Sequence, residues 1–127
     1  MADVNRGNRP LSPHLMIYRP QLTSISSIMV RITGIALLGT AFLIVWWFIA
    51  AATSPEYFAV VNGLLTSWFG DLIMALSTWA IFYHILGRIR HVIWDLGYAI
   101  EIETAEKMAI GMFALATILA LITFVAV

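Results

Sequence analysis

Long apolar runs separated by short polar stretches dominate the chain, and this pattern predicts membrane-spanning helices. Residues 32–52 form 21 consecutive positions without a charged side chain, and residues 108–127 form another 20. A helix rises about 1.5 Å per residue, so about 20 residues cross a hydrocarbon core of about 30 Å. A third uncharged run covers residues 72–87 and is extended by apolar positions before Asp71. We therefore predict three spans, over roughly residues 28–53, 64–90 and 106–127.

The stretches outside these runs carry ordinary signals for turns and helix ends. Residues 1–27 contain three prolines and no apolar run typical of a secretory signal, so we expect a polar, extended arm at the membrane surface. The connection 53–63 is expected as a loop, in which Ser54 and Pro55 are typical of a turn that opens a helix. Thr104 is predicted to cap the third span.

The overall composition indicates that these apolar helices belong to an integral membrane protein. Hydrophobic residues make up 61% of the 127 residues and charged residues only 11%, with a mean hydropathy of +0.92. A soluble domain is about half apolar and about a quarter charged. We therefore predict an all-α integral membrane fold, with residues 1–127 as a single membrane-anchor domain.

Charge and cysteine usage exclude several kinds of function. Seven basic residues balance seven acidic residues, so the chain offers no basic surface for nucleic acid. The sequence has no cysteine, which excludes disulfides, thiolate metal sites, iron–sulfur ligation and thiol catalysis by this chain.

The positions of the basic residues predict the orientation of the chain. All of them precede or open the first span or flank the connection between the second and third spans, and the first connection has none. They are Arg6, Arg9, Arg19, Arg31, Arg88, Arg90 and Lys107. Because basic residues near span ends stay on the cytoplasmic side, the N-terminus is expected inside and the C-terminus outside.

A polar stripe opens the first span. Ser27, Arg31 and Gly34 follow a spacing of i, i+4 and i+7, which places them on one helix face. From the residues alone, an interface anchor for Arg31 and a helix cap or back-bonded hydroxyl for Ser27 are favoured over a ligand site. Gly34 is compatible with close helix packing.

A second polar stripe ends the second span. It contains His84, Arg88, His91 and Asp95, at i, i+4, i+7 and i+11. An ionisable side chain inside a membrane is costly, and imidazole is a common ligand of metals and of haem. A structural hydrogen bond explains His84 equally well, His91 lies where it can be solvated, and Arg88 and Arg90 can simply set topology. A nearby aromatic group is interpreted as lipid contact and packing: Trp79, Phe82, Tyr83 and Trp94.

Two separated stretches resemble the signatures of the cytochrome b556 membrane-anchor subunit family of succinate dehydrogenase. The first comprises residues 9–15 (RPLSPHL), 17–18 (IY), 27–28 (SI) and 31–34 (RITG). The second comprises residues 83–84 (YH), 89–91 (IRH) and 94–97 (WDLG). The two occur in the family's order and spacing, and the resemblance covers nearly the whole chain.

The resemblance implies a role within a larger complex. Three spans would form half of a helical bundle, completed by a second small membrane-anchor subunit. Together the two anchors would hold a flavoprotein subunit and an iron–sulfur subunit at the membrane for electron transfer between the tricarboxylic acid cycle and the respiratory chain. The chain itself would be a non-flavin subunit of succinate:ubiquinone oxidoreductase. We expect a multi-pass protein of the bacterial inner membrane, with a cytoplasmic N-terminus and a periplasmic C-terminus.

The resemblance also implies roles for individual residues. His84 matches the axial ligand of a haem b shared with the partner anchor, whose own residue would supply the opposite ligand to the iron. Ser27 and Arg31 match positions at the ubiquinone site, and His91 and Arg88 match positions near the haem propionates. The chain departs from the family pattern twice: Val30 replaces the usual histidine, and Arg88 replaces a small residue.

A non-redox membrane protein, such as an assembly scaffold or a transporter subunit, is the alternative from another functional class. A transporter typically carries a broken helix or a charged group near the middle of the membrane. The predicted spans contain no proline and no charge at mid-membrane depth. Among the redox relatives, a fumarate reductase anchor would look similar, because the sequence does not reveal the direction of catalysis.

Overall fold

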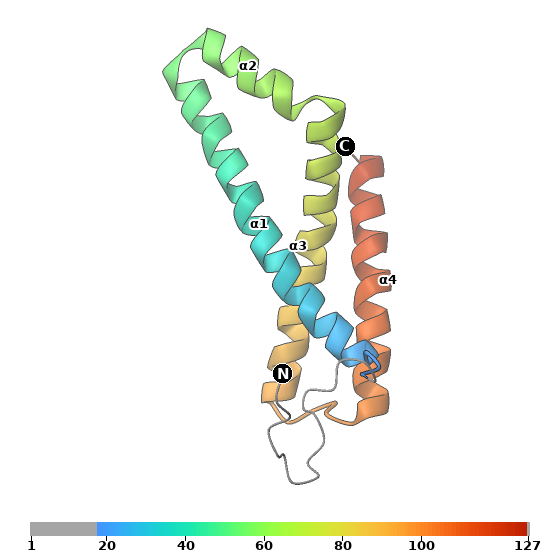
Figure 1. The fold of residues 1–127 in the computed structure, drawn as a ribbon. Coiled ribbons are helices and arrows are strands. Elements are labelled where there is room, and N and C mark those ends of the chain that lie inside the picture. The colour runs from blue at the N-terminus through green and yellow to red at the C-terminus, as the bar shows by residue number, and fades with distance from the viewer. Residues whose placement is uncertain (1–17, 127) are drawn as a thin grey trace, which may run out of the picture.

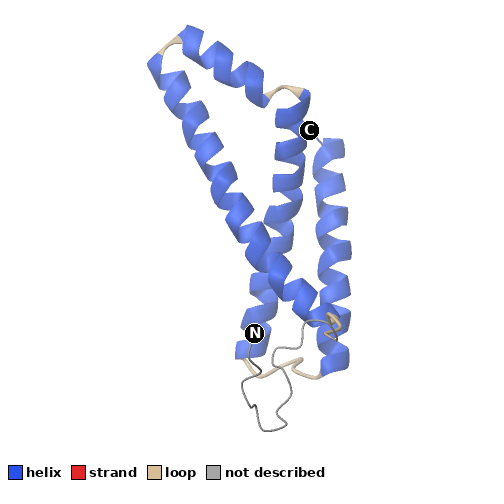
Figure 2. Cartoon of the chain, viewed as in Figure 1, coloured by secondary structure: helices blue, strands red, loops and turns tan. Residues whose placement is uncertain are grey.

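The computed structural model describes residues 18–126, which fold into four helices without any strand. These helices are α1 (Leu22–Thr53), α2 (Pro55–Leu65), α3 (Trp68–Asp95) and α4 (Ile102–Ala126). In Figure 1, α1 crosses α3 and then diverges from it toward α2, while α4 lies alongside α3. Only short loops join the helices (Figure 2).

Three helices are long and apolar enough to cross a membrane, and this confirms the all-α, three-span fold class. They are α1, α3 and α4, with 32, 28 and 25 residues, against the roughly 20 that a hydrocarbon core requires. Many of their large apolar side chains point outward, including Ile35, Phe42 and Phe124. Exposed apolar surface of this extent is rare on soluble monomers and suits contact with lipid or with another membrane chain.

The first helix begins earlier than the sequence pattern predicts. Residues 22–27, expected in the extended arm, already belong to α1. Ser27 is therefore a helical residue inside α1, and the helix-cap interpretation of its side chain is wrong. The expectation for residues 1–17, which include His14, and the last position of the third span, residue 127, lie outside the described residues.

The connection between the first two spans is a helix, and the expectation of a loop over 53–63 is wrong. Ser54 and Pro55, which are typical of a helix start in the sequence, do open this helix. Ser54 is the N-cap, and its hydroxyl accepts a hydrogen bond from the Tyr57 N–H at 3.2 Å. Pro55 follows in the first turn, where its missing N–H has no helical partner to lose. Hydrogen bonds from its own backbone N–H and then from the Ser54 hydroxyl lower the pKa of the Glu56 carboxyl, which lies outside the spans.

Two tryptophan side chains fix α2 against the end of α1. The indole N–H of Trp46 donates to the Tyr57 hydroxyl at 2.6 Å, and that of Trp47 donates to the Asn62 side-chain oxygen at 3.1 Å. Amphipathic aromatic residues are typical of membrane interfaces. Helix α2, with 11 residues, is too short to cross the membrane, and these contacts hold it against the end of α1 between two spans.

The boundaries of the other two spans also differ from the predicted ones. Helix α3 begins at Trp68, with the Ser67 hydroxyl accepting from the Gly70 N–H at 3.3 Å. Helix α4 begins at Ile102, so Thr104 lies inside its first turn and is not its cap. At the start of α4, the backbone N–H of Ala105 donates a hydrogen bond to the Glu101 carbonyl oxygen at 2.9 Å.

Helix α3 is the central element, because it packs against α1 and against α4 more extensively than those two helices pack against each other. Where it crosses α1, Gly87 faces the buried side chain of Val30, and a Cβ added at Gly87 would collide with that side chain. Small residues dominate the face of α4 that is buried: Ala105, Ala109, Met112, Ala116 and Ala120. Small residues let helix backbones approach closely in a membrane, where packing replaces the hydrophobic driving force.

We predict that Gly87→Ala destabilises the detergent-solubilised protein by about 1–3 kcal/mol, because overpacking forces the two backbones apart. The measurement is the midpoint of thermal unfolding. Gly111→Ala is the matched control, since nothing lies within 4 Å of a Cβ at that helical position. Equal midpoints for the two variants would contradict a close crossing at Gly87.

Candidate functional site

A polar cavity of about 580 Å³ lies between α1 and α3 at their crossing. All five predicted site residues line it: Ser27 and Arg31 from α1, and His84, Arg88 and His91 from α3. The remaining lining residues are Val30, Gly34, Ile35 and Leu38. Its volume is within the usual range for sites that bind small molecules or cofactors, about 300–1,000 Å³. The two polar stripes of the sequence thus meet at one place, whereas Asp95 is not part of the lining.

The imidazole of His84 is held by the backbone of α1. Its Nδ1 lies 2.9 Å from the Val30 carbonyl oxygen and 3.3 Å from the Thr33 hydroxyl oxygen. A carbonyl can only accept a hydrogen bond, so Nδ1 carries the proton in this arrangement. In the neutral ring, Nε2 then retains its lone pair and is free to act as an acceptor or a metal ligand.

The other side of the ring faces the cavity. The Nε of Arg88 donates to His84 Nε2 at 3.3 Å, from an exposed guanidinium that can turn away. Gly34 makes room for the ring, since a Cβ at that position would lie 2.9 Å from His84 Cε1. The sequence suggests that Gly34 allows close helix packing, and the structure shows that it leaves space for the His84 imidazole.

The donor set limits the kind of metal that this chain can hold. Among residues 18–126, no three histidine or acidic side chains are grouped closely enough to bind a bare ion. His84 supplies a single nitrogen, so a metal bound there must bring its remaining ligands from elsewhere. A porphyrin-bound iron meets this condition.

The rim of the cavity is positively charged. Arg31 and Arg88 are both exposed, and no carboxylate is among the lining residues. In the described part of the chain the one ion pair is remote, between Lys107 and Glu103 at 2.7 Å. His91 adds a polar ring to the lining, with Nδ1 at 2.7 Å from the Gly87 carbonyl oxygen. Guanidinium groups bind carboxylates well, so the rim suits an anionic group.

Sequence reasoning missed a buried network beside the cavity. Arg90 is only 1% exposed and donates to the Ser26 hydroxyl at 2.8 Å and to the Ser27 hydroxyl at 3.3 Å. Ser26 also bonds to the Tyr83 hydroxyl at 3.0 Å, and the guanidinium lies 4.6 Å from the centre of the Trp94 ring. The i, i+7, i+11 spacing of Tyr83, Arg90 and Trp94 was the available signal.

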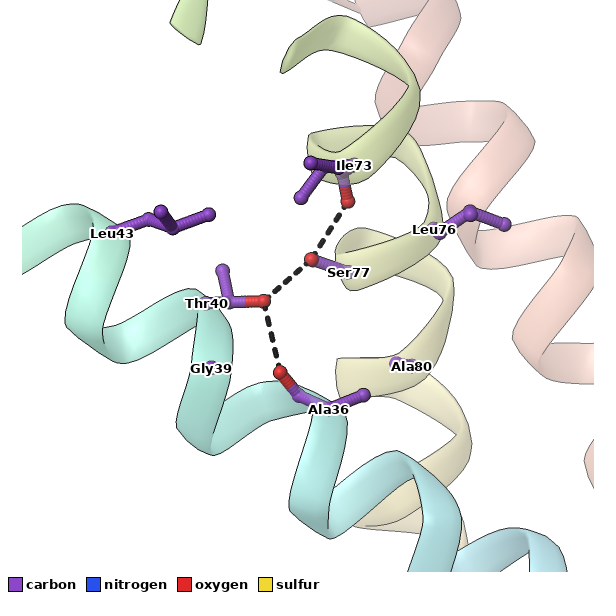
Figure 3. A pocket seen from close by; sticks show the side chains of 8 residues that line it. All are labelled: Ala36, Gly39, Thr40, Leu43, Ile73, Leu76, Ser77 and Ala80. Atoms are coloured by element: carbon purple, nitrogen blue, oxygen red, sulfur yellow. Dashed lines mark hydrogen bonds between the residues drawn. The ribbon is translucent and has the colours of Figure 1, made fainter. Parts of the chain in front are cut away.

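An apolar cavity of about 470 Å³ lies farther along the same two helices (Figure 3). Two of its lining side chains, Thr40 of α1 and Ser77 of α3, point toward each other, with their hydroxyl oxygens 2.7 Å apart. Ser77 also donates to the Ile73 carbonyl at 2.7 Å, and Thr40 lies 3.2 Å from the Ala36 carbonyl. Both hydroxyls therefore have partners, and the rest of the lining suits an apolar chain better than a polar ligand.

The chain is similar to known proteins over almost its whole length. A family model for the succinate dehydrogenase/fumarate reductase transmembrane subunit matches residues 5–123. A succinate dehydrogenase cytochrome b556 subunit of Paracoccus denitrificans is 50% identical over 125 residues, which cover 98% of this chain and 96% of that protein.

More distant relatives carry similar names. A succinate dehydrogenase cytochrome b560 subunit of Reclinomonas americana is 37% identical over 123 residues, covering 93% of this chain and 85% of that protein. A cytochrome b556 subunit of Rickettsia bellii is 37% identical over 98 residues, covering 77% of this chain and 76% of that protein. The family match includes every residue that lines the polar cavity.

Proposed function

The chain belongs to the succinate dehydrogenase/fumarate reductase transmembrane subunit family, and we infer that it is the cytochrome b membrane anchor of a succinate:ubiquinone oxidoreductase. The family match confirms the resemblance carried by the two signature stretches. In this role the chain is not the catalyst of succinate oxidation, which belongs to a flavoprotein subunit. It holds that subunit and an iron–sulfur subunit at the membrane. The observation that carries the proposal is the meeting of five residues, far apart in sequence, around one polar cavity.

The residues of the polar cavity fit a haem b. His84 would ligate the iron through Nε2, with its ring orientation fixed by the Val30 carbonyl. Arg88 and His91 would face the propionates, which suits their polar character and their position in the lining of the cavity. When bound, the haem supplies a one-electron carrier. The departure at Val30 fits this arrangement, because the position contributes its backbone oxygen and not its side chain.

A second membrane-anchor subunit would complete the cavity. Ile35 and Leu38 line the polar cavity and are 75% and 59% exposed, so the described chain forms only one wall. Of the two described histidines that line the cavity, His91 lies about two turns nearer the end of α3, so His84 would be this chain's axial ligand and the second would come from the partner. We therefore propose that the haem is shared between the two anchors.

Ubiquinone would bind at the end of the cavity that holds Ser27 and Arg31. A hydroxyl and a guanidinium can both donate to a quinone carbonyl and stabilise negative charge on its oxygen. Their place at the start of a span lets the long apolar tail of a quinone remain in the lipid. The iron–sulfur subunit would dock on the same side of the membrane.

The non-redox alternative has less support. Within the described residues, the helices α1, α3 and α4 contain no proline and are continuous. Transporter sites are typically built where a span is broken near its middle. A scaffold role does not explain why polar residues from two spans converge on one cavity.

We also propose that the protein lies in a bacterial inner membrane with its N-terminus in the cytoplasm. Helix α1 begins at the same end of the structure as the α3–α4 connection, and α2 lies at the other end (Figure 1). The described basic residues occur at the first of these ends, and α2 has none. This separation supports the orientation through the positive-inside rule.

Reporter fusions test the orientation. We expect alkaline phosphatase fused after Thr53 and after Val127 to be active, because both junctions would lie in the periplasm. Enzyme activity of cells carrying each fusion is the measurement. An inactive fusion after Val127, together with an active cytoplasmic reporter at the same junction, would contradict the three-span topology.

Arg31→Ala tests the quinone site. We expect the succinate:quinone reductase activity of membranes containing the assembled complex to fall roughly ten- to hundredfold, the usual cost of losing a hydrogen bond from a charged donor. Succinate oxidation with a soluble artificial acceptor should survive, because the flavin chemistry lies on another subunit.

Two further variants separate a binding role from an anchoring role for Arg31. Arg31→Lys should restore activity only in part, because the planar fork of donors is lost. Arg19→Ala, at an exposed position before α1, should have little effect. Full quinone activity in Arg31→Ala would leave Arg31 as an interface anchor and contradict the proposed site.

A further inference from the structure

Arg90 is a buried cation that has no counter-ion within residues 18–126. It is 1% exposed, no carboxylate pairs with it among the described residues, and its Nε has no hydrogen-bond partner. An arginine that only sets topology would extend its charged head toward water. Removing a guanidinium from water without an anionic partner is costly, so its position calls for a role inside the protein.

The guanidinium is held in one orientation. Its Nη1 donates to Ser26, and Ser26 is tied in turn to the fully buried Tyr83 hydroxyl, 3.0 Å away. The Trp94 ring covers one face of the guanidinium, at 4.6 Å from the ring centre. These contacts leave Nη2 directed at Ser27, at 3.3 Å, on the wall of the polar cavity.

The Ser27 hydroxyl differs from most other hydroxyls of the spans. Seven of those lie within hydrogen-bond distance of a backbone carbonyl one turn earlier: Thr33, Thr40, Thr53, Ser77, Thr78, Thr117 and Thr123. Ser27 makes no such bond to any described residue. A guanidinium has only donors, so the Ser27 oxygen accepts from Arg90 and its own hydrogen remains available to the cavity.

We propose that Arg90 is a positioning residue that directs the Ser27 hydroxyl hydrogen toward a carbonyl oxygen of the bound quinone. Accepting a bond from a cation also makes the hydroxyl a stronger donor, because hydrogen bonds in a chain polarise one another. Arg90 acts through Ser27 and does not touch the quinone itself. This inference rests on the proposed function, in which Ser27 binds a quinone.

A purely structural role is the competing explanation. In that case the network would only join α1 to α3, and its loss would lower thermal stability without changing affinity for quinone. A positioning role predicts that Arg90 and Ser27 affect the same hydrogen bond. Their effects on the KM for quinone should then overlap, not multiply.

The test measures steady-state kinetics of the assembled complex with a short-tailed ubiquinone. The variants are Ser27→Ala, Arg90→Lys and the double variant. We expect each single change to raise the KM for quinone roughly three- to tenfold, and the double change to raise it no further than Ser27→Ala. Lysine keeps the charge but not the two-pronged contact with both serines. Ser24→Ala, an exposed hydroxyl one turn earlier, is the control and should leave KM unchanged.

A second route to the same comparison avoids changing the buried arginine. Ser26→Ala removes the Nη1 acceptor and loosens the guanidinium. It should raise KM in the wild-type background and have no further effect in the Ser27→Ala background. This pair decides the question if Arg90→Lys does not assemble.

The outcomes separate the inference from the proposed function. An unchanged KM in Ser27→Ala would contradict quinone binding at Ser27 and the inference with it. A raised KM in Ser27→Ala, with either no effect of the Arg90 and Ser26 variants or effects that multiply in the double variants, would leave the quinone site intact and overturn the positioning role.

Discussion

The hydrogen bond between His84 Nδ1 and the Val30 carbonyl joins α3 to α1 at their crossing, and the polar cavity depends on it. It forms because the two backbones approach closely, which Gly87 permits on the α3 side and Gly34 permits around the imidazole. The bond gives the ring a defined tautomer and turns Nε2 toward the cavity. The proposed cofactor ligand is thus oriented by the backbone of a neighbouring span.

Positive charge is the second constraint on this end of the molecule. Arg31 and Arg88 lie on the rim of the cavity and Arg90 lies buried behind Ser27, with no carboxylate paired to any of them in the described residues. The same basic residues that are expected to orient the chain in the membrane therefore also create a site for anionic or carbonyl groups. The proposed topology and the proposed ligand recognition would thus draw on one set of side chains.

Much of this arrangement follows from the sequence, because charge-free runs reveal spans and a 3.6-residue period reveals faces. The stripes through Arg31 and His84 identified all five predicted residues of the polar cavity. Helix α2 was missed because its run is too short for a span and its capping signal also fits a turn. Arg90 was missed because its contacts depend on how α1 crosses α3, and the periodicity of a single helix carries no information about the partner it meets.

The central claim is that this crossing holds a haem through His84. It is tested most directly by the reduced-minus-oxidised absorption spectrum of the purified complex containing His84→Ala. We predict that the b-type bands are lost or shifted while the flavoprotein and iron–sulfur subunits remain attached, because His91, the other described histidine of the polar cavity, lies about two turns farther along α3 toward its end. A spectrum identical to that of the wild-type complex would contradict the assignment.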